Sequence, residues 1–313
     1  MALHIETTNR CVLACPACPR TAWRDITKIP LEKSDLDVDL LEKFLDCDKG
    51  RQITEFVLSG DYGDCIYYPD LFKLIERFRD RVCFNLVTNG SRQTEKFWRR
   101  LAELLTSKDT ITFSIDGTQD TNHLYRINSD WPSIMTGLDI MAQSSARVHW
   151  KTIVFKFNYD KLEEIKQFAE SRGATWHAEK THRYENLELI PPTEYVENNY
   201  LFQDDFVENH QIEIEPQCEK SAMVVTADGY LFPCDWIRNP RTLYKSQLWK
   251  QKQRWIDQVN MRTTNYSQAL TVIRDWENHV RENSLNGSGH VDILCKMRCR
   301  KGCIADNKIA VNF

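Results

Sequence analysis

The feature that most constrains the fold is a sixfold alternation of short apolar runs and amphipathic stretches between residues 2 and 180. Runs such as "ITEFVLSG" and "VCFNLVTNG" have the length and the branched or aromatic content of buried strands, and helical spacing follows in "PDLFKLIERFRD". Strands that alternate with helices predict a parallel sheet covered by helices. Because six units are too few to close an eight-stranded barrel, we expect an open sheet or a partial barrel. Ligands then bind at the carboxyl ends of the strands.

Composition narrows the class of protein. With 313 residues, of which 42% are hydrophobic, the chain can build one large domain, or one large and one small. A net charge of −4 provides no global basic field, so nucleic acid is not an expected partner. No apolar run approaches the roughly 18–20 residues that span a bilayer, and the start "MALHIETTNR" is no signal peptide. We therefore expect a cytoplasmic protein with no membrane partner.

The chain has eleven cysteines, and three of them are grouped near its start. Cys11, Cys15 and Cys18 have the spacing C-x3-C-x2-C directly after the first predicted strand, with no further cysteine before Cys47. Tetrahedral zinc needs four ligands, whereas three thiolates on a cubane iron–sulfur cluster leave one iron open to bind a small molecule. A zinc site that borrows a distant ligand, or an accidental grouping of cysteines, is the alternative.

This motif, in the loop after the first strand of a six-unit β/α chain, resembles that of the radical S-adenosylmethionine enzymes. The resemblance implies a partial (β/α)6 barrel over residues 1–180 and a 4Fe–4S cluster on Cys11, Cys15 and Cys18. It implies that the open iron chelates S-adenosylmethionine, which is reductively cleaved to a 5′-deoxyadenosyl radical that abstracts hydrogen from a substrate. An electron donor such as flavodoxin or ferredoxin is the implied partner.

Segments at successive strand ends resemble the parts of that family that surround the cofactor. The stretch "LSGDYGDC" takes the place of a glycine-rich turn, and a guanidinium such as that of Arg126 fits the cofactor carboxylate. Glycine, Asn-Gly and Asp-Gly are also generic turn formers, so ordinary βα turns are the alternative. The resemblance implies cofactor contacts for Gly60, Asp61, Gly63, Asn89, Ser114, Asp116, Arg126 and Asn158.

The chain changes character after the sixth unit. Residues 181–216 are acidic, contain paired prolines and are predicted to be a linker. From residue 217 the pattern differs again, and "SAMVVTADGYLFPC" predicts a β-hairpin that turns at Asp228-Gly229. We therefore expect a small cysteine-rich α+β domain over residues 217–313.

The cysteines of this last segment form a second group. Their arrangement around the hairpin resembles the C-terminal extension called SPASM, or its shorter form, the twitch domain. Five cysteines fit one auxiliary 4Fe–4S cluster better than two. A zinc site built from the same residues is the alternative. The resemblance implies that the auxiliary cluster is bound by Cys218 and Cys234 with two of Cys295, Cys299 and Cys303.

The reaction has more than one reading. In the first, the enzyme oxidises or cross-links its substrate, and the auxiliary cluster accepts the electron left after hydrogen abstraction. In the second, that cluster only shapes the pocket of a redox-neutral reaction such as an epimerisation. A peptide and a carbohydrate-like small molecule are both open as substrates. A non-catalytic metal-binding scaffold is a third reading, but it would have no use for an open iron beside a cofactor pocket.

Overall fold

The computed structural model describes residues 1–21, 33–180, 187–195, 223–233 and 258–285. The described strands are β1 (Ala2–Ile5), β2 (Glu55–Leu58), β3 (Cys83–Thr88), β4 (Thr110–Ser114), β5 (Arg147–Ile153), β6 (Thr175–Glu179), β7 (Met223–Val225) and β8 (Leu231–Phe232). The described α-helices are α2 (Val38–Leu45), α3 (Leu71–Phe78), α4 (Glu95–Leu104), α5 (Trp131–Ala142), α6 (Leu162–Ser171) and α11 (Tyr266–Leu285).

These strands form one sheet with the order β6-β5-β4-β3-β2-β1-β7-β8. All neighbours among β1 to β6 pair in parallel. The hairpin strand β7 pairs in parallel with β1 and antiparallel with β8. The prediction of an α/β fold with a parallel sheet is therefore confirmed, and β6 and β8 form the two edges of the described sheet.

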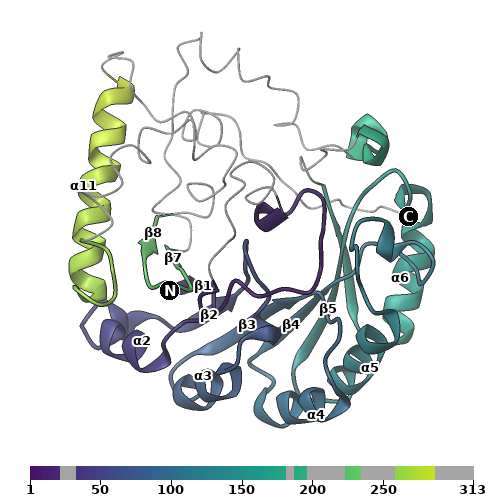
Figure 1. Ribbon diagram of the computed structural model, residues 1–313, viewed down its shortest axis with the longest axis horizontal. Helices are drawn as coiled ribbons and strands as arrows, with labels where there is room; N and C mark the ends of the chain where they lie inside the picture. Colours follow the sequence, from purple (N-terminus) through teal and green to yellow (C-terminus); the bar gives the residue numbers. More distant parts are fainter. Residues whose placement is uncertain (22–32, 181–186, 196–222, 234–257, 286–313) are drawn as a thin grey trace.

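The helices form because their apolar side chains recur at helical spacing. In α3 the buried residues Leu71, Leu74, Ile75 and Phe78 make one stripe along the helix. Helices α2 to α6 lie in an arc around the outside of the strands (Figure 1). They therefore cover one face of the sheet, and the opposite face is called the inner face below.

Side-chain alternation in β5 shows which residues belong to each face. Trp150 is fully buried and its ring lies near those of Trp131 in α5 and Phe168 in α6, so it points toward the helices. Successive side chains of a strand point to opposite faces. His149, Lys151 and Ile153 therefore lie on the inner face.

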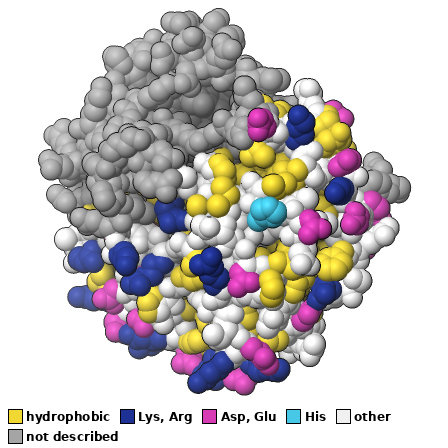
Figure 2. Space-filling view, turned by 45° about the vertical axis from the view of Figure 1, so that its right-hand side comes forward, with side chains coloured by type: hydrophobic (Ala, Val, Ile, Leu, Met, Phe, Trp, Pro, Cys, Tyr) yellow, Lys and Arg dark blue, Asp and Glu magenta, His cyan; other side chains and the backbone are white. Residues whose placement is uncertain are grey.

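The helical surface carries both signs of charge. Basic and acidic side chains are interspersed over it (Figure 2), and some form exposed ion pairs such as Arg100 with Glu76. Among the described helices, none is both long enough and apolar enough to cross a membrane.

The described part of residues 217–313 joins the same sheet and core. Gly229 has a φ of +92° in the turn between β7 and β8, so the predicted hairpin at Asp228-Gly229 is present. The Tyr266 ring of α11 lies 5.7 Å from that of Phe44, in the main hydrophobic core. The division of the chain into residues 1–180, 181–216 and 217–313 stays a prediction.

Candidate functional site

The cysteine loop, residues 6–21, crosses the carboxyl ends of the parallel strands. Backbone hydrogen bonds tie it to two other strand-end loops. The N–H of Asp64, after β2, donates to the Arg10 carbonyl at 2.9 Å, and the N–H of Ala14 donates to the carbonyl of Ile127, after β4, at 3.0 Å. The loop is therefore held over the sheet on both sides of Cys11.

The cysteines differ in their surroundings. Cys15 is buried, whereas Cys11 and Cys18 are partly exposed. Burial raises the pKa of the Cys11 thiol to about 12 and that of Cys15 to about 11, although the nearby Arg126 guanidinium opposes the rise at Cys15. Metal ligands must be thiolates, so a bound cation would have to displace these protons. The buried members of the surrounding apolar cluster are Leu13, Cys15, Ala17, Tyr125 and Phe155.

The donor set suits a cluster better than a single ion. Among the described residues, no three His, Cys, Asp or Glu side chains converge as ligands of one metal ion. In an iron–sulfur cluster each thiolate binds a different iron, so the sulfurs surround the cluster at a wider spacing than the ligands of one ion. Three cysteines on one tethered loop therefore fit a three-thiolate cluster, and Cys11, Cys15 and Cys18 are the residues that would hold it.

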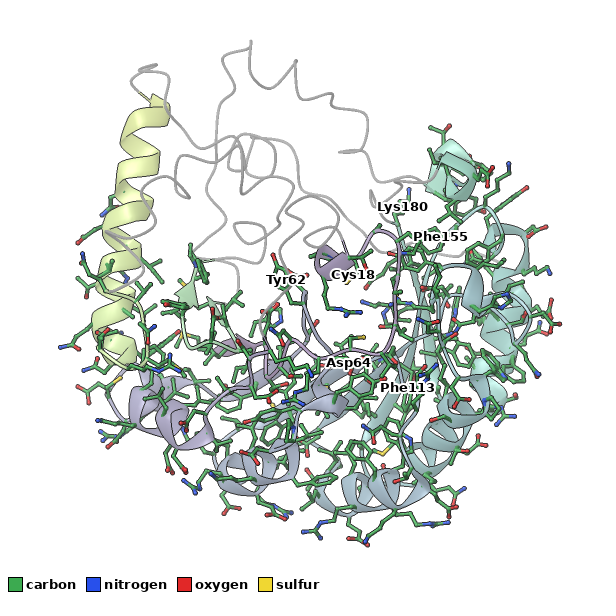
Figure 3. All side chains as sticks on the ribbon, viewed as in Figure 1. Cys18, Tyr62, Asp64, Phe113, Phe155 and Lys180 are labelled. Carbon is green, nitrogen blue, oxygen red and sulfur yellow. The ribbon has the colours of Figure 1, made fainter. Side chains whose placement is uncertain are left out.

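Asp61 links the loop after β2 to the cysteine loop through its backbone. Its N–H donates to a Glu6 carboxylate oxygen at 2.7 Å, and its carbonyl accepts from the Cys18 thiol at 3.5 Å. Figure 3 shows Cys18 and the neighbouring Tyr62 on the side of the sheet away from α3 and α4. The predicted contact of Asp61 with the cofactor stays a prediction, but its backbone lies beside one of the proposed cluster ligands.

Gly60 and Gly63, in the loop after β2, lie so close to other backbone atoms that a side chain would not fit. A Cβ on Gly63 would lie 2.0 Å from the carbonyl oxygen of Thr8, and one on Gly60 would lie 2.5 Å from the carbonyl oxygen of Gly63. Both neighbours are backbone atoms that cannot rotate away. The structure therefore gives these glycines a packing role, and it leaves their predicted cofactor contacts as predictions.

Asn89, directly after β3, is oriented toward the cysteine loop. Its side-chain amide donates to the Cys11 sulfur at 3.6 Å and to the buried Asp64 carboxylate, and its carbonyl oxygen accepts from the Tyr67 hydroxyl at 3.1 Å. Burial raises the pKa of Asp64, and the Asn89 N–H, which donates at 2.6 Å, opposes that rise. The sequence placed Asn89 at a cofactor pocket, and the structure shows it holding a proposed cluster ligand.

Asp116 and Arg126 form a buried ion pair beside Cys15. The Arg126 Nε lies 2.6 Å from Asp116 Oδ2, and the side chains are 14% and 0% exposed. The other Asp116 oxygen accepts from the Ile153 N–H at 2.8 Å. Burial disfavours the guanidinium charge, but the Asp116 carboxylate, together with Cys15 and Tyr125, raises the pKa of Arg126. Asp116 and Arg126, which were both predicted to contact the cofactor, therefore pair with each other.

Asn158 joins backbone groups near the ends of β4 and β5. Its side chain is fully buried, accepts from the Phe155 N–H at 2.7 Å and donates to the Ile153 carbonyl at 2.9 Å and to the Asp116 carbonyl. These contacts brace the strand ends. Ser114 ends β4 beside Lys151 of β5. Cofactor contacts by Asn158 and Ser114 stay predictions.

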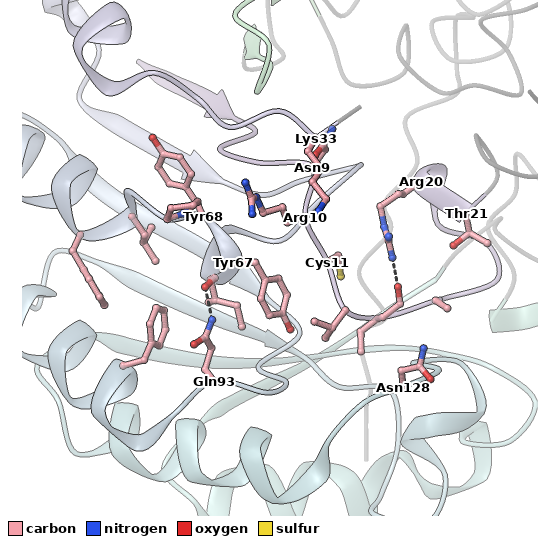
Figure 4. Close-up of a pocket in the computed structure, with 18 residues that line it drawn as sticks. Asn9, Arg10, Cys11, Arg20, Thr21, Lys33, Tyr67, Tyr68, Gln93 and Asn128 are labelled. Atoms are coloured by element: carbon pink, nitrogen blue, oxygen red, sulfur yellow. Dashed lines mark hydrogen bonds between the residues drawn. The ribbon is translucent and has the colours of Figure 1, made fainter. Parts of the chain in front are cut away.

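A cavity of about 1060 Å³ borders the cysteine loop (Figure 4). Arg10, Cys11 and Tyr67 are among the residues that line it. Arg20, which also lines it, donates to the Leu13 carbonyl and so steadies the wall. Cys11 is thus accessible from this cavity, in contrast to the buried Cys15.

Sequence reasoning missed a group of polar side chains on the inner face. His149 and Lys151 come from β5, and His177 and Glu179 come from β6. The signal was present, because polar residues alternate with apolar ones in "RVHWKTI" and "TWHAE". The proposed ligands of the auxiliary cluster lie outside the described residues: Cys218, Cys234, Cys295, Cys299 and Cys303.

Comparison with known proteins supports the fold and the family pattern. The family model of the Radical SAM superfamily matches residues 5–170. No curated protein matches the chain.

The solved structures that are similar in fold include the following two. One is anSMEcpe with bound AdoMet and a peptide named Kp18Cys, with a TM-score of 0.58, 13% identity, and coverage of 88% of this chain and 82% of that chain. The other is Streptococcus suis SuiB bound to S-adenosylmethionine, with a TM-score of 0.54, 11% identity and coverage of 75% of this chain. The aligned part spans only 60% of the length of SuiB.

Proposed function

The chain belongs to the radical SAM superfamily, and we propose that it reductively cleaves S-adenosylmethionine to a 5′-deoxyadenosyl radical that abstracts hydrogen from a substrate. The observation that carries this proposal is the cysteine loop. Its three thiols lie on one tethered loop at the carboxyl ends of a parallel sheet, where such sheets bind ligands. The parallel sheet with its outer helices supports a partial (β/α)6 barrel.

In this proposal the cluster and cofactor, when bound, supply the electron and the carbon-centred radical. The chain's own residues build the site. Cys11, Cys15 and Cys18 hold the cluster, and the apolar cluster around Cys15 excludes water from that ligand. Asn89 donates to the Cys11 sulfur and so fixes its orientation. Electrons come from a carrier such as flavodoxin or ferredoxin.

We also propose that residues 217–313 carry a twitch-like module with one auxiliary 4Fe–4S cluster, after a linker at 181–216. The cysteine pattern supports it, as does the β7–β8 hairpin, since Cys234 follows β8 closely in sequence. The proposed ligands are Cys218 and Cys234 with two of Cys295, Cys299 and Cys303. This cluster would accept the electron released in an oxidation or a cross-link.

Two substrate classes remain in the proposal. A peptide is supported by the fold similarity to anSMEcpe, a protein solved with a peptide bound. A carbohydrate-like molecule is favoured by the polar inner face of β5 and β6.

The experiment is anaerobic reconstitution with iron and sulfide, followed by reaction with S-adenosylmethionine and dithionite. We expect about eight irons per chain, the sum of two cubane clusters, and release of 5′-deoxyadenosine. The joint variant Cys11→Ala, Cys15→Ala, Cys18→Ala should keep about four irons and release none.

A matched control is Cys47→Ala, which removes a partly exposed cysteine that lies outside both groups. It should behave as the parent does. If the fully reconstituted parent releases no 5′-deoxyadenosine with any reductant tried, the chain is a non-catalytic metal-binding scaffold and not an enzyme. Zinc at the second site with about four irons in the parent would overturn the auxiliary cluster.

A further inference from the structure

The inner face of the sheet carries charged and polar side chains that no step above uses. The Lys151 Nζ lies 3.4 Å from a Glu179 carboxylate oxygen, and the His177 Nε2 lies 3.6 Å from the other. The His149 ring lies 6.1 Å from that of His177. His149, Lys151, His177 and Glu179 are called the inner-face cluster.

The cluster lies next to the cysteine loop. Ile153, on the same face of β5, packs against the apolar residues around Cys15. Glu179 on β6 is paired in register with Ile153 on β5, so it lies at the same height in the sheet as the contact between Ile153 and the residues around Cys15. Lys151 is two residues earlier on β5, which at a rise of about 3.3 Å per residue places it about 7 Å nearer the amino end of the strand. A group bound here would therefore lie beside the proposed site of radical formation.

A purely structural role does not explain these residues well. Parallel strands covered by helices are usually apolar, and Val148, Trp150 and Ala178 follow that rule on the helix-facing side, where the buried Thr152 hydroxyl donates to the Ile115 carbonyl. On the inner face the Lys151, His177 and Glu179 side chains remain 23–30% exposed, so packing does not fill the space around them. Exposed charges at the ligand end of such a sheet point to recognition.

The charges define what can bind. Lys151 and Glu179 have opposite signs and offset each other, so this pair does not select a strongly anionic or cationic ligand. Although burial opposes it, His177 and Lys151 lower the pKa of Glu179, which keeps this carboxylate ionised as a hydrogen-bond acceptor. Lys151 only donates hydrogen bonds, and an ionised Glu179 only accepts them. A hydroxyl matches this mixture, since it donates to a carboxylate and accepts from an ammonium.

We propose that the inner-face cluster binds the substrate, and that the bound portion is an uncharged group rich in hydroxyls. This proposal rests on the proposed function, because it places that group beside the cysteine loop. The hydroxyls can come from a carbohydrate-like molecule or from a hydroxyl side chain of a peptide, and the same residues would serve either.

The test is saturation-transfer NMR of the reconstituted enzyme with S-adenosylmethionine. The probes are methyl glucoside, the peptide Gly-Ser-Gly and, as a probe without a side-chain hydroxyl, Gly-Leu-Gly. We expect saturable binding of a hydroxyl probe. Lys151→Met and Glu179→Gln should each weaken it at least about tenfold, as expected for loss of a hydrogen bond to a charged group. Binding of methyl glucoside alone assigns a carbohydrate-like source, and binding of Gly-Ser-Gly assigns a peptide.

Arg147→Met is the matched control. It removes an exposed charge from the amino end of the same strand and should leave probe binding unchanged. His177→Gln is a second variant in case one of the others does not fold, which circular dichroism would reveal. The proposal is overturned if neither hydroxyl probe saturates, if Gly-Leu-Gly binds equally well, or if the folded variants bind as the parent does. Iron content and 5′-deoxyadenosine release are measured separately, so failure of the proposed function is distinguishable from failure of this site.

Discussion

The buried pair of Asp116 and Arg126 allows a quantitative test of the site's geometry. In Asp116→Asn the shape is kept and the charge is lost, which leaves the Arg126 guanidinium, only 14% exposed, without its counterion. The asparagine Oδ1 can accept from only one of the Arg126 Nε–H and the Ile153 N–H, so the other faces the asparagine NH2 as donor against donor. Breaking a buried ion pair by removing one partner costs about 3–5 kcal/mol. We expect the free energy of unfolding to fall by that amount.

The assay is equilibrium urea unfolding of the cluster-free, reduced chain, followed by circular dichroism. Removing the cluster separates the stability of the fold from any role of Asp116 toward the cofactor. Glu95→Gln is the control, because its ion pair with Arg99 is exposed at both ends (60% and 65%) and should be worth about 0.5 kcal/mol or less. The double variant Asp116→Asn, Arg126→Met should recover part of the loss, since no unpaired charge remains. A loss below about 1 kcal/mol for Asp116→Asn would refute the buried, paired geometry.

Three further predictions concern the contacts of the cysteine loop and the inner-face cluster. Asn89→Leu removes the donor to the Cys11 sulfur, so the cluster's reduction potential should become more negative and iron affinity should fall about 10–100-fold. Redox titration followed by EPR measures the potential, and competition with a chelator measures the iron affinity. An unchanged potential would contradict the hydrogen bond from Asn89 to the Cys11 sulfur. Gly63→Ala places a Cβ against the Thr8 carbonyl and should lower the free energy of unfolding, measured with urea, by about 1–3 kcal/mol. A variant as stable as the parent would argue against the close contact. Because the pKa of Glu179 is lowered, its ionised form stabilises the fold above its ordinary pKa of 4.5, and this contribution is lost as the pH falls through the folded-state value. The stability difference between parent and Glu179→Gln should therefore shrink in acid, and a difference that is constant with pH would count against the ion pair.

The parallel sheet could be predicted from sequence because its signals are local. Apolar runs and helical spacing alternate within short windows, and the C-x3-C-x2-C motif fixes its own position after β1. The hairpin at Asp228-Gly229 is local for the same reason. The pairing of the hairpin with β1 is not a local signal, because nothing in either segment indicates which of the two sheet edges the hairpin joins.

The directions of side chains at the site could be predicted less well. A family pattern names Asn89 and Asn158 as pocket residues, yet only tertiary structure shows that Asn89 turns to Cys11 and Asn158 turns to backbone groups. The inner-face cluster was missed because an alternating strand is equally consistent with a solvent-facing surface. Which face of β5 and β6 is covered depends on helices elsewhere in the chain.

The pairing of β7 with β1 has a consequence for the order of events during synthesis. Translation proceeds at about 5–20 residues per second, so β1 emerges on the order of 10–40 s before the strand that completes its hydrogen bonds. During that interval Leu3 and Ile5 belong to an open strand edge, the kind of template on which nascent chains pair with one another. A chain that stops after α6 would keep this edge permanently. The β7–β8 hairpin, which is made long after β1, thus covers the open edge of the first strand, and chains that end after α6 should be recovered as aggregates before any question of catalysis arises.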